Sequence, residues 1–217
     1  MLDLYFIRHA ESAMNCEAHL IGGRSEGTPL SDKGKSQAQL LGKRFLLQGI
    51  KFHKIYSSPL LRSIDTARLV GEQIGYPGKE LIISDDLIEL SQGDWEGQPR
   101  TEIYTPETLA RINADNWNFT PPKGESQRAV EQRMLRFVKN ELLPLDQPNK
   151  NIICCIFTHG VAIKCLLRGI MKFTPKITYR VWLDNAAVTR LQHTDHKWYV
   201  MNINDTGHLL GVSPENI

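Results

Sequence analysis

The chain has 217 residues, and its hydrophobic content of 41% is enough for an ordinary globular core. Its 26 Lys and Arg against 24 Asp and Glu give a formal net charge of +2, a balance that argues against a nucleic-acid-binding protein. No apolar stretch is long enough to span a bilayer. Because residues 1–7 contain no basic region or cleavage signal, we expect a cytoplasmic protein.

The first predicted element is an apolar strand over residues 1–7, which ends abruptly in Arg8 and His9. Open α/β sheets bind ligands just beyond the carboxyl ends of their strands. There, Arg8 can hold phosphate oxygens through its planar fork, and His9 offers a nucleophilic or basic nitrogen. A histidine after a buried strand is more often a packing residue, so the pair needs support from elsewhere in the chain.

An amphipathic helix is predicted next, over residues 31–48. Ser31 is a candidate N-cap, and Ala38, Leu41 and Phe45 fall on one helical face. This helix is expected to cover one face of a sheet.

A strand followed by a helix, over residues 54–56 and 59–74, repeats the design of the first strand end. Ser57 and Ser58 join the two elements, and Arg62 falls in the first turn of the helix. An arginine there opposes the positive end of the helix dipole. This position therefore indicates a bound anion between the arginine and the helix.

The segment 98–123 differs from its surroundings because it is polar and rich in proline, with a short helix expected over residues 105–115. We interpret it as a lid over the site. Four aromatic side chains in or near it form either an apolar substrate wall or ordinary core packing, and the sequence leaves both open. They are Trp95, Tyr104, Trp117 and Phe119.

The carboxyl-terminal third supplies the remaining layers. A helix over residues 126–143 ends at Pro144. An apolar strand over residues 151–158 leads through His159 and Gly160 into a helix over residues 161–171. A second strand end thus delivers a histidine, which is the support that the first pair needed.

Two strands over residues 187–193 and 198–203 form an antiparallel hairpin around a polar turn. Strands that alternate with helices, followed by one hairpin, predict a three-layer α/β/α sandwich with a mostly parallel mixed sheet. We expect one domain over residues 1–217, with the lid at residues 98–123.

The four cysteines show no metal-binding pattern, and the adjacent pair at 154 and 155, in a predicted buried strand, is expected to be reduced thiols packed as small hydrophobic residues. The four are Cys16, Cys154, Cys155 and Cys165.

Five motifs in order resemble the histidine phosphatase superfamily, which includes cofactor-dependent phosphoglycerate mutases and many small-molecule phosphatases. The matching segments are RHAES at 8–12, SSPLLRSIDTA at 57–67, LIELSQGDWEG at 87–97, GES at 124–126 and THG at 158–160. Together with DNAAVTRL and NDTGHL near the C-terminus, they extend over nearly the whole chain.

The resemblance implies a catalytic role for five residues. His9 resembles the nucleophile that becomes a phosphohistidine, and Arg8, Arg62 and His159 resemble the positive pocket around the phosphoryl oxygens. Glu89 resembles the acid that protonates the leaving oxygen and later activates water. On composition alone, Glu89 is one of several solvated acids, and its place in the motif reverses that interpretation.

Further ligand-binding residues are expected around this set. Asn15 and either Ser57 or Ser58 offer neutral donors to the same oxygens, and the spacing does not choose between the two serines. Gly160, which follows the second histidine, is also expected to contact the substrate.

Two more candidates are less well placed by the sequence. Arg24 is either close to a second anionic group of the substrate or exposed and solvated. His208 either reaches the site, as the NDTGHL resemblance suggests, or lies on the surface.

Two departures from the family pattern concern backbone and pocket shape. Ala10 and Val161 stand where the family usually has glycine. Neither departure removes a charge or a nucleophile, so activity is expected to survive. Both leave the identity of the substrate undetermined.

We therefore predict a metal-independent phosphomonoesterase with no cofactor, whose partner is a small-molecule phosphate ester. A phosphoglycerate mutase is the first alternative, and a non-catalytic phospho-ligand binder is the second. The sequence does not specify the oligomeric state.

Overall fold

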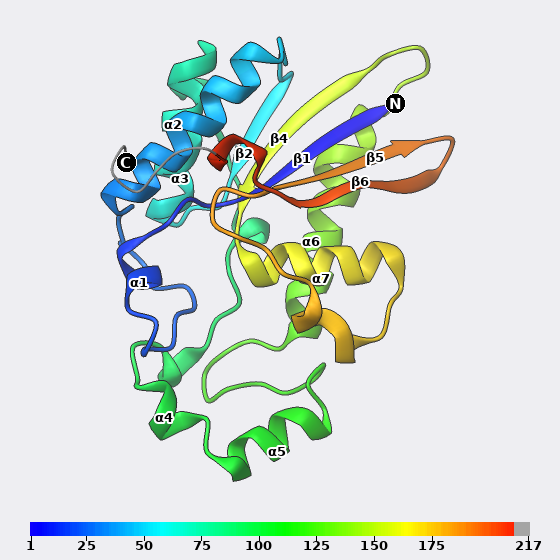
Figure 1. Ribbon diagram of the computed structural model, residues 1–217. Coiled ribbons are helices and arrows are strands. Elements are labelled where there is room, and N and C mark those ends of the chain that lie inside the picture. Colours follow the sequence, from blue (N-terminus) through cyan, green and yellow to red (C-terminus); the bar gives the residue numbers. More distant parts are fainter. Residues whose placement is uncertain (211–217) are drawn as a thin grey trace.

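The computed structural model describes residues 1–210, and its centre is one six-stranded sheet in the order β3-β2-β4-β1-β5-β6 (Figure 1). Parallel pairing joins β1 to β4, β4 to β2 and β2 to β3, whereas β5 is antiparallel to both β1 and β6. The predicted mixed, mostly parallel sheet is confirmed. The strands are β1 (Leu2–Arg8), β2 (Lys54–Ser57), β3 (Ile82–Ile83), β4 (Ile152–Thr158), β5 (Val188–Thr194) and β6 (Lys197–Asp205).

Helices cover both faces of the sheet, α2 and α3 on one face and α6 and α7 on the other (Figure 1). This arrangement confirms the three-layer α/β/α sandwich. The α-helices are α1 (Ala13–Cys16), α2 (Asp32–Leu47), α3 (Leu61–Ile74), α4 (Arg100–Ile103), α5 (Pro106–Ala114), α6 (Gln127–Phe137) and α7 (Gly160–Met171).

The alternation of side chains along the central strands divides the core into two clusters. Leu4 and Phe6 pack in the cluster under α6 and α7, while Tyr5 and Ile7 pack in the cluster under α2 and α3. Each fully buried Leu, Ile or Phe side chain stabilises the fold by roughly 1.5–3 kcal/mol.

The adjacent cysteines of β4 follow the same alternation. Cys154 and Cys155 are fully buried free thiols, one in each cluster. Their predicted role as small hydrophobic residues is confirmed, and burial raises the pKa of both thiols.

The predicted hairpin forms with a tight turn between β5 and β6. Asp195 and His196 both adopt positive φ angles, of 49° and 60°. Two such residues match the turn that best fits the right-handed twist of two adjacent strands.

The structure differs from the predicted elements in several places, and the short helices α1 and α4 are among the elements that were not predicted. The helix expected to end at Pro144 changes after α6 into a π-helical turn, Val138–Leu142, and then a 3₁₀ turn, Leu143–Leu145. The two-residue strand β3 is too short to leave a periodic signal. A 3₁₀ helix, Pro175–Arg180, was not predicted either, and its Tyr179 lines the site.

The segment 98–123 lies apart from the three layers, with α4 and α5 beyond the sandwich (Figure 1). Its predicted helix is α5, whose N-cap Thr105 accepts a hydrogen bond from the backbone N–H of Thr108. The segment is anchored at Trp117, whose ring centre lies 3.4 Å from the guanidinium carbon of Arg168 in α7.

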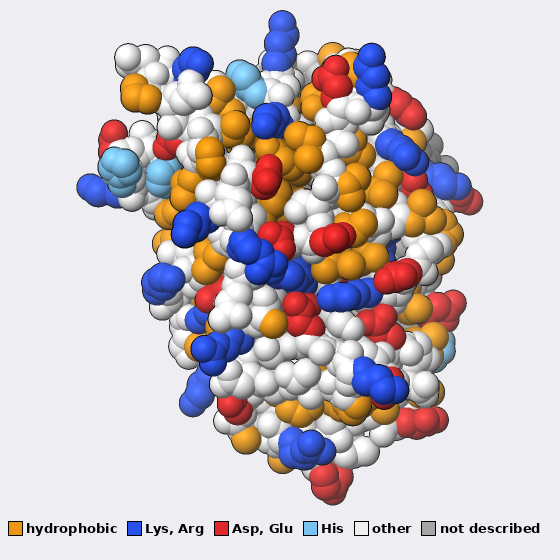
Figure 2. Space-filling model, turned by 180° about the vertical axis from the view of Figure 1, so that it is seen from behind, with side chains coloured by type: hydrophobic (Ala, Val, Ile, Leu, Met, Phe, Trp, Pro, Cys, Tyr) orange, Lys and Arg blue, Asp and Glu red, His pale blue; other side chains and the backbone are white. Residues whose placement is uncertain are grey.

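Acidic and basic side chains are interspersed on the face seen in Figure 2. Within residues 1–210, no helix has both the length and the apolar character that a membrane crossing requires.

Candidate active site

The two predicted histidines follow the ends of two neighbouring parallel strands. Arg8 in β1 pairs in register with Thr158 in β4, so the residues that follow leave the sheet side by side. The rings of His9 and His159 consequently lie with their centroids 5.1 Å apart. The structure thus brings together two residues that are 150 positions apart in the sequence.

His9 is held in one orientation by both ring nitrogens. Its Nδ1 lies 2.7 Å from the carbonyl oxygen of Ala10, so that nitrogen carries the proton and donates it. Its Nε2 then accepts a hydrogen bond of 3.2 Å from Nε of Arg62. Burial, together with the charges of Arg62 and Arg8, lowers the pKa of His9 well below its usual value. The ring is therefore neutral, with its free electron pair on Nε2.

Arg62 is buried in the first turn of α3, which carries no acidic residue. Its terminal nitrogens donate to the carbonyl oxygens of Gly23, Arg24 and Ser25 at 2.9, 2.7 and 3.3 Å. Burial lowers its pKa from the ordinary value, although the nearby Glu89 opposes the shift. The guanidinium is thus fixed beside His9 by backbone groups, with no directly bonded carboxylate.

Arg8 contributes a second guanidinium, which is half-buried, from the last position of β1. One of its terminal nitrogens donates to the carbonyl oxygen of Leu183 at 2.5 Å, whereas its buried Nε has no hydrogen-bond partner among the described residues. Gly160 lies against it, because a Cβ atom at Gly160 would be 3.5 Å from that Nε. An unsatisfied buried donor is costly, so this nitrogen is well suited to meet an anionic oxygen.

His159 is completely buried at the start of α7. Its Nε2 lies 2.8 Å from the hydroxyl oxygen of Ser58, and its Nδ1 has no partner among the described residues. Burial and the charge of Arg62 lower its pKa well below the usual value, so this ring is also neutral.

The structure distinguishes the two serines that the sequence could not. Ser58 contacts His159, and its hydroxyl oxygen also accepts from the backbone N–H of Leu60 at 3.3 Å. Ser57 bonds instead to the carbonyl oxygen of Ser58 and to the hydroxyl of Ser63. Neither serine lines the cavity, and only Ser58 touches a site histidine.

Glu89 lines the cavity and caps the N-terminus of α7. Its carboxylate accepts hydrogen bonds from the backbone N–H groups of Leu90, Val161 and Ala162 at 2.9, 3.1 and 3.1 Å. A carboxylate at a helix N-terminus interacts favourably with the helix dipole. The acid is thereby fixed at the edge of the pocket that contains Arg8, His9 and Arg62.

The two departures from the family pattern have different surroundings. Ala10 is buried without a positive φ angle, and its backbone N–H donates to Thr66 at 3.0 Å. Its methyl group is therefore accommodated without backbone strain. Val161 lines the cavity.

Asn15 lies in the cavity wall, as predicted. Its side-chain oxygen accepts from the backbone N–H and hydroxyl of Ser12 and from the amide of Asn185. Asn185 also donates to the carbonyl oxygen of His9 at 3.1 Å. Asn185 falls in the DNAAVTRL segment, but no role was predicted for it, because a single asparagine in a loop carries no periodic or spacing signal.

Arg24 and His208 do not line the cavity. The guanidinium of Arg24 lies 3.7 Å from the carboxylate of Glu125. His208 lies near Arg44 and Asp205 in a half-buried position, and burial lowers its pKa to about 4. Contact of these two side chains with the substrate therefore stays a prediction that the cavity lining does not support.

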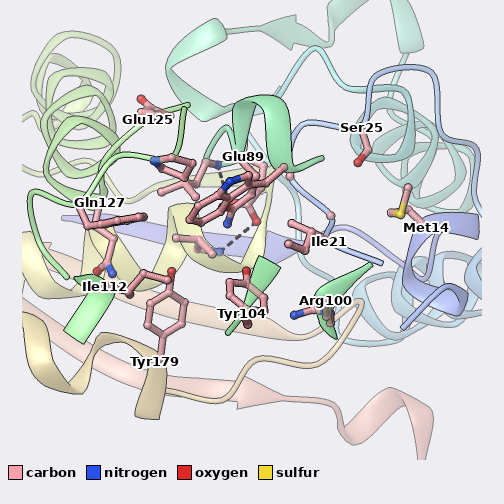
Figure 3. A pocket seen from close by; sticks show the side chains of 18 of the residues that line it. Met14, Ile21, Ser25, Glu89, Arg100, Tyr104, Ile112, Glu125, Gln127 and Tyr179 are labelled. Carbon is pink, nitrogen blue, oxygen red and sulfur yellow. Dashed lines mark hydrogen bonds between the residues drawn. The ribbon is translucent and has the colours of Figure 1, made fainter. Parts of the chain in front are cut away.

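The cavity has a volume of about 490 Å³, and its lining extends from Glu89 to Ile112 and Tyr179 (Figure 3). Three of the four aromatic side chains considered from the sequence line it, namely Trp95, Tyr104 and Phe119. Trp117 does not, because it packs on Arg168. The outer wall also includes Leu109, Ile112, Asn113, Asn116, Gln127 and Tyr179.

Among residues 1–210, no three His, Cys, Asp or Glu side chains are grouped as metal ligands.

Two arginines and two neutral histidines near the strand ends of an α/β sandwich form an arrangement suited to a phosphate group. The family model of the histidine phosphatase superfamily (branch 1) matches residues 4–206, and the chain belongs to this superfamily.

Individual relatives carry different activities in their names. A probable phosphoglycerate mutase GpmB from Yersinia enterocolitica is 29% identical, over 96% of this chain and 95% of that protein. A putative alpha-ribazole-5'-P phosphatase from Escherichia coli superposes with a TM-score of 0.77 at 26% identity, covering 94% of this chain and 97% of its own. A phosphoserine phosphatase from Entamoeba histolytica, in complex with phosphoserine, has a TM-score of 0.77 at 25% identity and covers 97% of this chain and 100% of its own.

Proposed function

We propose that the protein is a phosphomonoesterase that hydrolyses a small-molecule phosphate ester through a phosphohistidine on His9. The observation that carries this proposal is the neutral His9 ring, whose Nδ1 is bonded to the carbonyl oxygen of Ala10 and whose Nε2 is directed at Arg62. A histidine nucleophile needs this combination of an unprotonated nitrogen and an adjacent cation.

In the first step, Nε2 of His9 forms a bond to phosphorus while the bond between phosphorus and the ester oxygen breaks. The phosphate oxygens take up the N–H groups of Arg62, which frees the electron pair on Nε2. The unpaired Nε of Arg8 and Nδ1 of His159 then donate to the same phosphoryl group. For His159, this assignment follows if the Ser58 hydroxyl donates to Nε2 and leaves the proton on Nδ1.

Glu89 is proposed to move the protons in both steps. It takes up a proton when the substrate's charge arrives and gives it to the departing alkoxide. In the second step it removes a proton from a water molecule, whose oxygen forms a bond to phosphorus while the bond between phosphorus and Nε2 breaks. Inorganic phosphate leaves, and His9 returns to its neutral form.

The segment 98–123 is proposed to act as a lid. It contributes Tyr104, Leu109 and Phe119 to the cavity, and it lies outside the sheet and its covering helices (Figure 1). Such a segment can close over a bound ester and exclude bulk water during phosphoryl transfer.

A phosphoglycerate mutase is the second candidate, because the curated relative at 29% identity carries that name. A mutase must return the phosphoryl group from the histidine to its substrate before water reaches it. The two proposals therefore differ in the acceptor of the second step.

The test is phosphate release from a panel of phosphomonoesters with metal chelated, run beside interconversion of 3- and 2-phosphoglycerate with the bisphosphate primer present. Release that is lost in a His9→Ala variant is the expected result. Interconversion with little release would replace the phosphatase by the mutase. Inactivity in both assays would overturn the catalytic proposal in favour of a binding protein.

A further inference from the structure

The outer half of the cavity has a chemical character of its own. Trp95 is in contact with two other aromatic rings, at a centroid distance of 5.6 Å to Phe119 and 6.2 Å to Tyr104. Tyr179, from the 3₁₀ helix Pro175–Arg180, lies on another side of the same cavity, with Ile112 nearby (Figure 3). These side chains give the outer cavity an apolar lining for the part of the substrate beyond the phosphate.

Two carboxylates, those of Glu89 and Glu125, line the cavity and repel a carboxylate on the substrate. Both oxygens of Glu125 are bonded to Arg133, at 2.9 and 3.0 Å, and Arg24 lies 3.7 Å from the same carboxylate. Arg133 is therefore committed to a protein acid, and Arg24 lies beside the same carboxylate, although its Nε has no hydrogen-bond partner among the described residues. Among the lining residues beyond Arg8 and Arg62, all of which belong to the described part of the chain, Arg100 is the only Lys or Arg. Its guanidinium carbon lies 5.9 Å from the ring centre of Tyr104.

One polar group in this half of the cavity lacks a partner. Gln127 is 4% exposed and lines the cavity, and its side-chain oxygen has no hydrogen-bond partner among the described residues. A buried acceptor without a donor is costly, and a ligand N–H or O–H would satisfy it.

We propose that the preferred substrates are phosphate esters of bulky alcohols that carry an aromatic body and a hydrogen-bond donor but no carboxylate, an inference that rests on the proposed phosphatase function. The aromatic body packs against Trp95, Tyr104 and Phe119, and the donor bonds to Gln127. A cavity of about 490 Å³ fits such a molecule, since pockets of this size enclose most of a drug-sized ligand.

The test compares esters whose alcohols have similar leaving-group chemistry, so that differences report on contacts with the outer cavity. Ethyl phosphate and 2-phenylethyl phosphate differ by the ring, and burial of that ring predicts a kcat/KM for the second that is about tenfold higher or more. 3-Phosphoglycerate and phosphoserine are expected to react no faster than ethyl phosphate. Equal values for the two alkyl esters, or a clear preference for the carboxylates, would overturn the proposal.

Two variants test whether the aromatic side chains of the cavity cause the preference for the phenylethyl ester. Tyr104→Ala should reduce the ratio of kcat/KM between the phenylethyl and ethyl esters by about tenfold. Tyr199→Ala makes the same change at a half-exposed position in β6 outside the cavity, and it should leave the ratio unchanged. An unchanged ratio in Tyr104→Ala, with the fold verified by circular dichroism, would refute the aromatic wall.

The hydrogen-bond donor is tested with 2-(indol-3-yl)ethyl phosphate and 2-(naphthyl)ethyl phosphate, which are similar in size but differ in an N–H group. The indole ester should react roughly 3- to 10-fold faster, and Gln127→Leu should remove the difference. The absence of any difference in the unmodified protein would overturn the role of Gln127. If no ester at all is hydrolysed, the phosphatase function fails, and that result is distinct from hydrolysis without preference.

Discussion

The two ends of the cavity are built in different ways. At the inner end, Arg8, His9 and Arg62 come from a central strand and a helix start, and their positions are fixed by hydrogen bonds to backbone groups. The outer end is built from the segment 98–123 and a 3₁₀ helix, where Leu109 and Tyr179 are 42% and 52% exposed. In the proposed function, the sheet positions the groups that react, whereas the peripheral segments contact the rest of the substrate.

The largest expected effect is at the nucleophile. His9→Ala should reduce kcat by about 10⁴-fold or more for every ester, because the phosphohistidine cannot form. Steady-state phosphate release measures the effect. His19→Ala, which removes an exposed imidazole, serves as the matched control and should retain full activity. Undiminished turnover in His9→Ala would remove the proposed role.

Arg62→Lys tests whether the inner end needs a guanidinium rather than just a positive charge. Lysine cannot reproduce the fork that contacts both His9 and the backbone carbonyls, so we expect kcat/KM to fall by roughly 10²- to 10³-fold. The same exchange at Arg68, on the same helix with its side chain 60% exposed, should change little. Equal activity of the two variants would contradict the assignment.

Glu89→Gln should separate substrates by their leaving groups. The amide cannot donate a proton as the carboxylic acid does, so alkyl esters should slow by about 10²-fold, whereas p-nitrophenyl phosphate, with its good leaving group, should slow far less. The ratio of kcat/KM for the two esters is the readout. Glu72→Gln on the exposed side of α3 is the control. Equal slowing of both esters would argue against Glu89 as the acid.

The smallest expected effect concerns stability rather than catalysis. His9 and His159 have folded-state pKa values well below the usual one, so the unfolded chain binds more protons when the pH falls below about 6.5. Stability is therefore complete above that pH and decreases on acidification until the folded pKa is reached.

From about pH 7.5 to about pH 5.5, each of the two histidines should cost about 1.4 kcal/mol of unfolding free energy. Urea unfolding at both pH values measures this loss, and His9→Ala should show a smaller one than His19→Ala. The same loss in both variants would mean that His9 is not held neutral in the folded protein.

The sequence predicted the inner end far better than the outer end. Arg8, His9 and Arg62 sit at junctions between strands and helices, where hydrophobic periodicity and capping rules locate them within a residue or two. The pairing of β1 with β4 then places His159 beside His9. These positions follow from topology, which the strand and helix pattern specifies.

The rest depended on side-chain contacts between distant segments. Ser57 and Ser58 differ only in which direction each side chain leaves the end of β2, and a periodic pattern cannot resolve their hydrogen-bond partners. Arg24 was expected near substrate, but Glu125, 101 residues further along the chain, lies beside it. Tyr179 and Gln127 line the cavity from separate elements, and no sequence motif predicts their position there.

The most direct test of the central claim is rapid acid-free quenching of the protein during turnover of 2-phenylethyl phosphate, followed by peptide mapping of the bound phosphoryl group by mass spectrometry. We predict an acid-labile phosphoryl group on the peptide that contains His9, formed at a rate at least equal to kcat and absent from His9→Ala. Turnover without such a group, or a phosphoryl group on a different residue, would contradict the account.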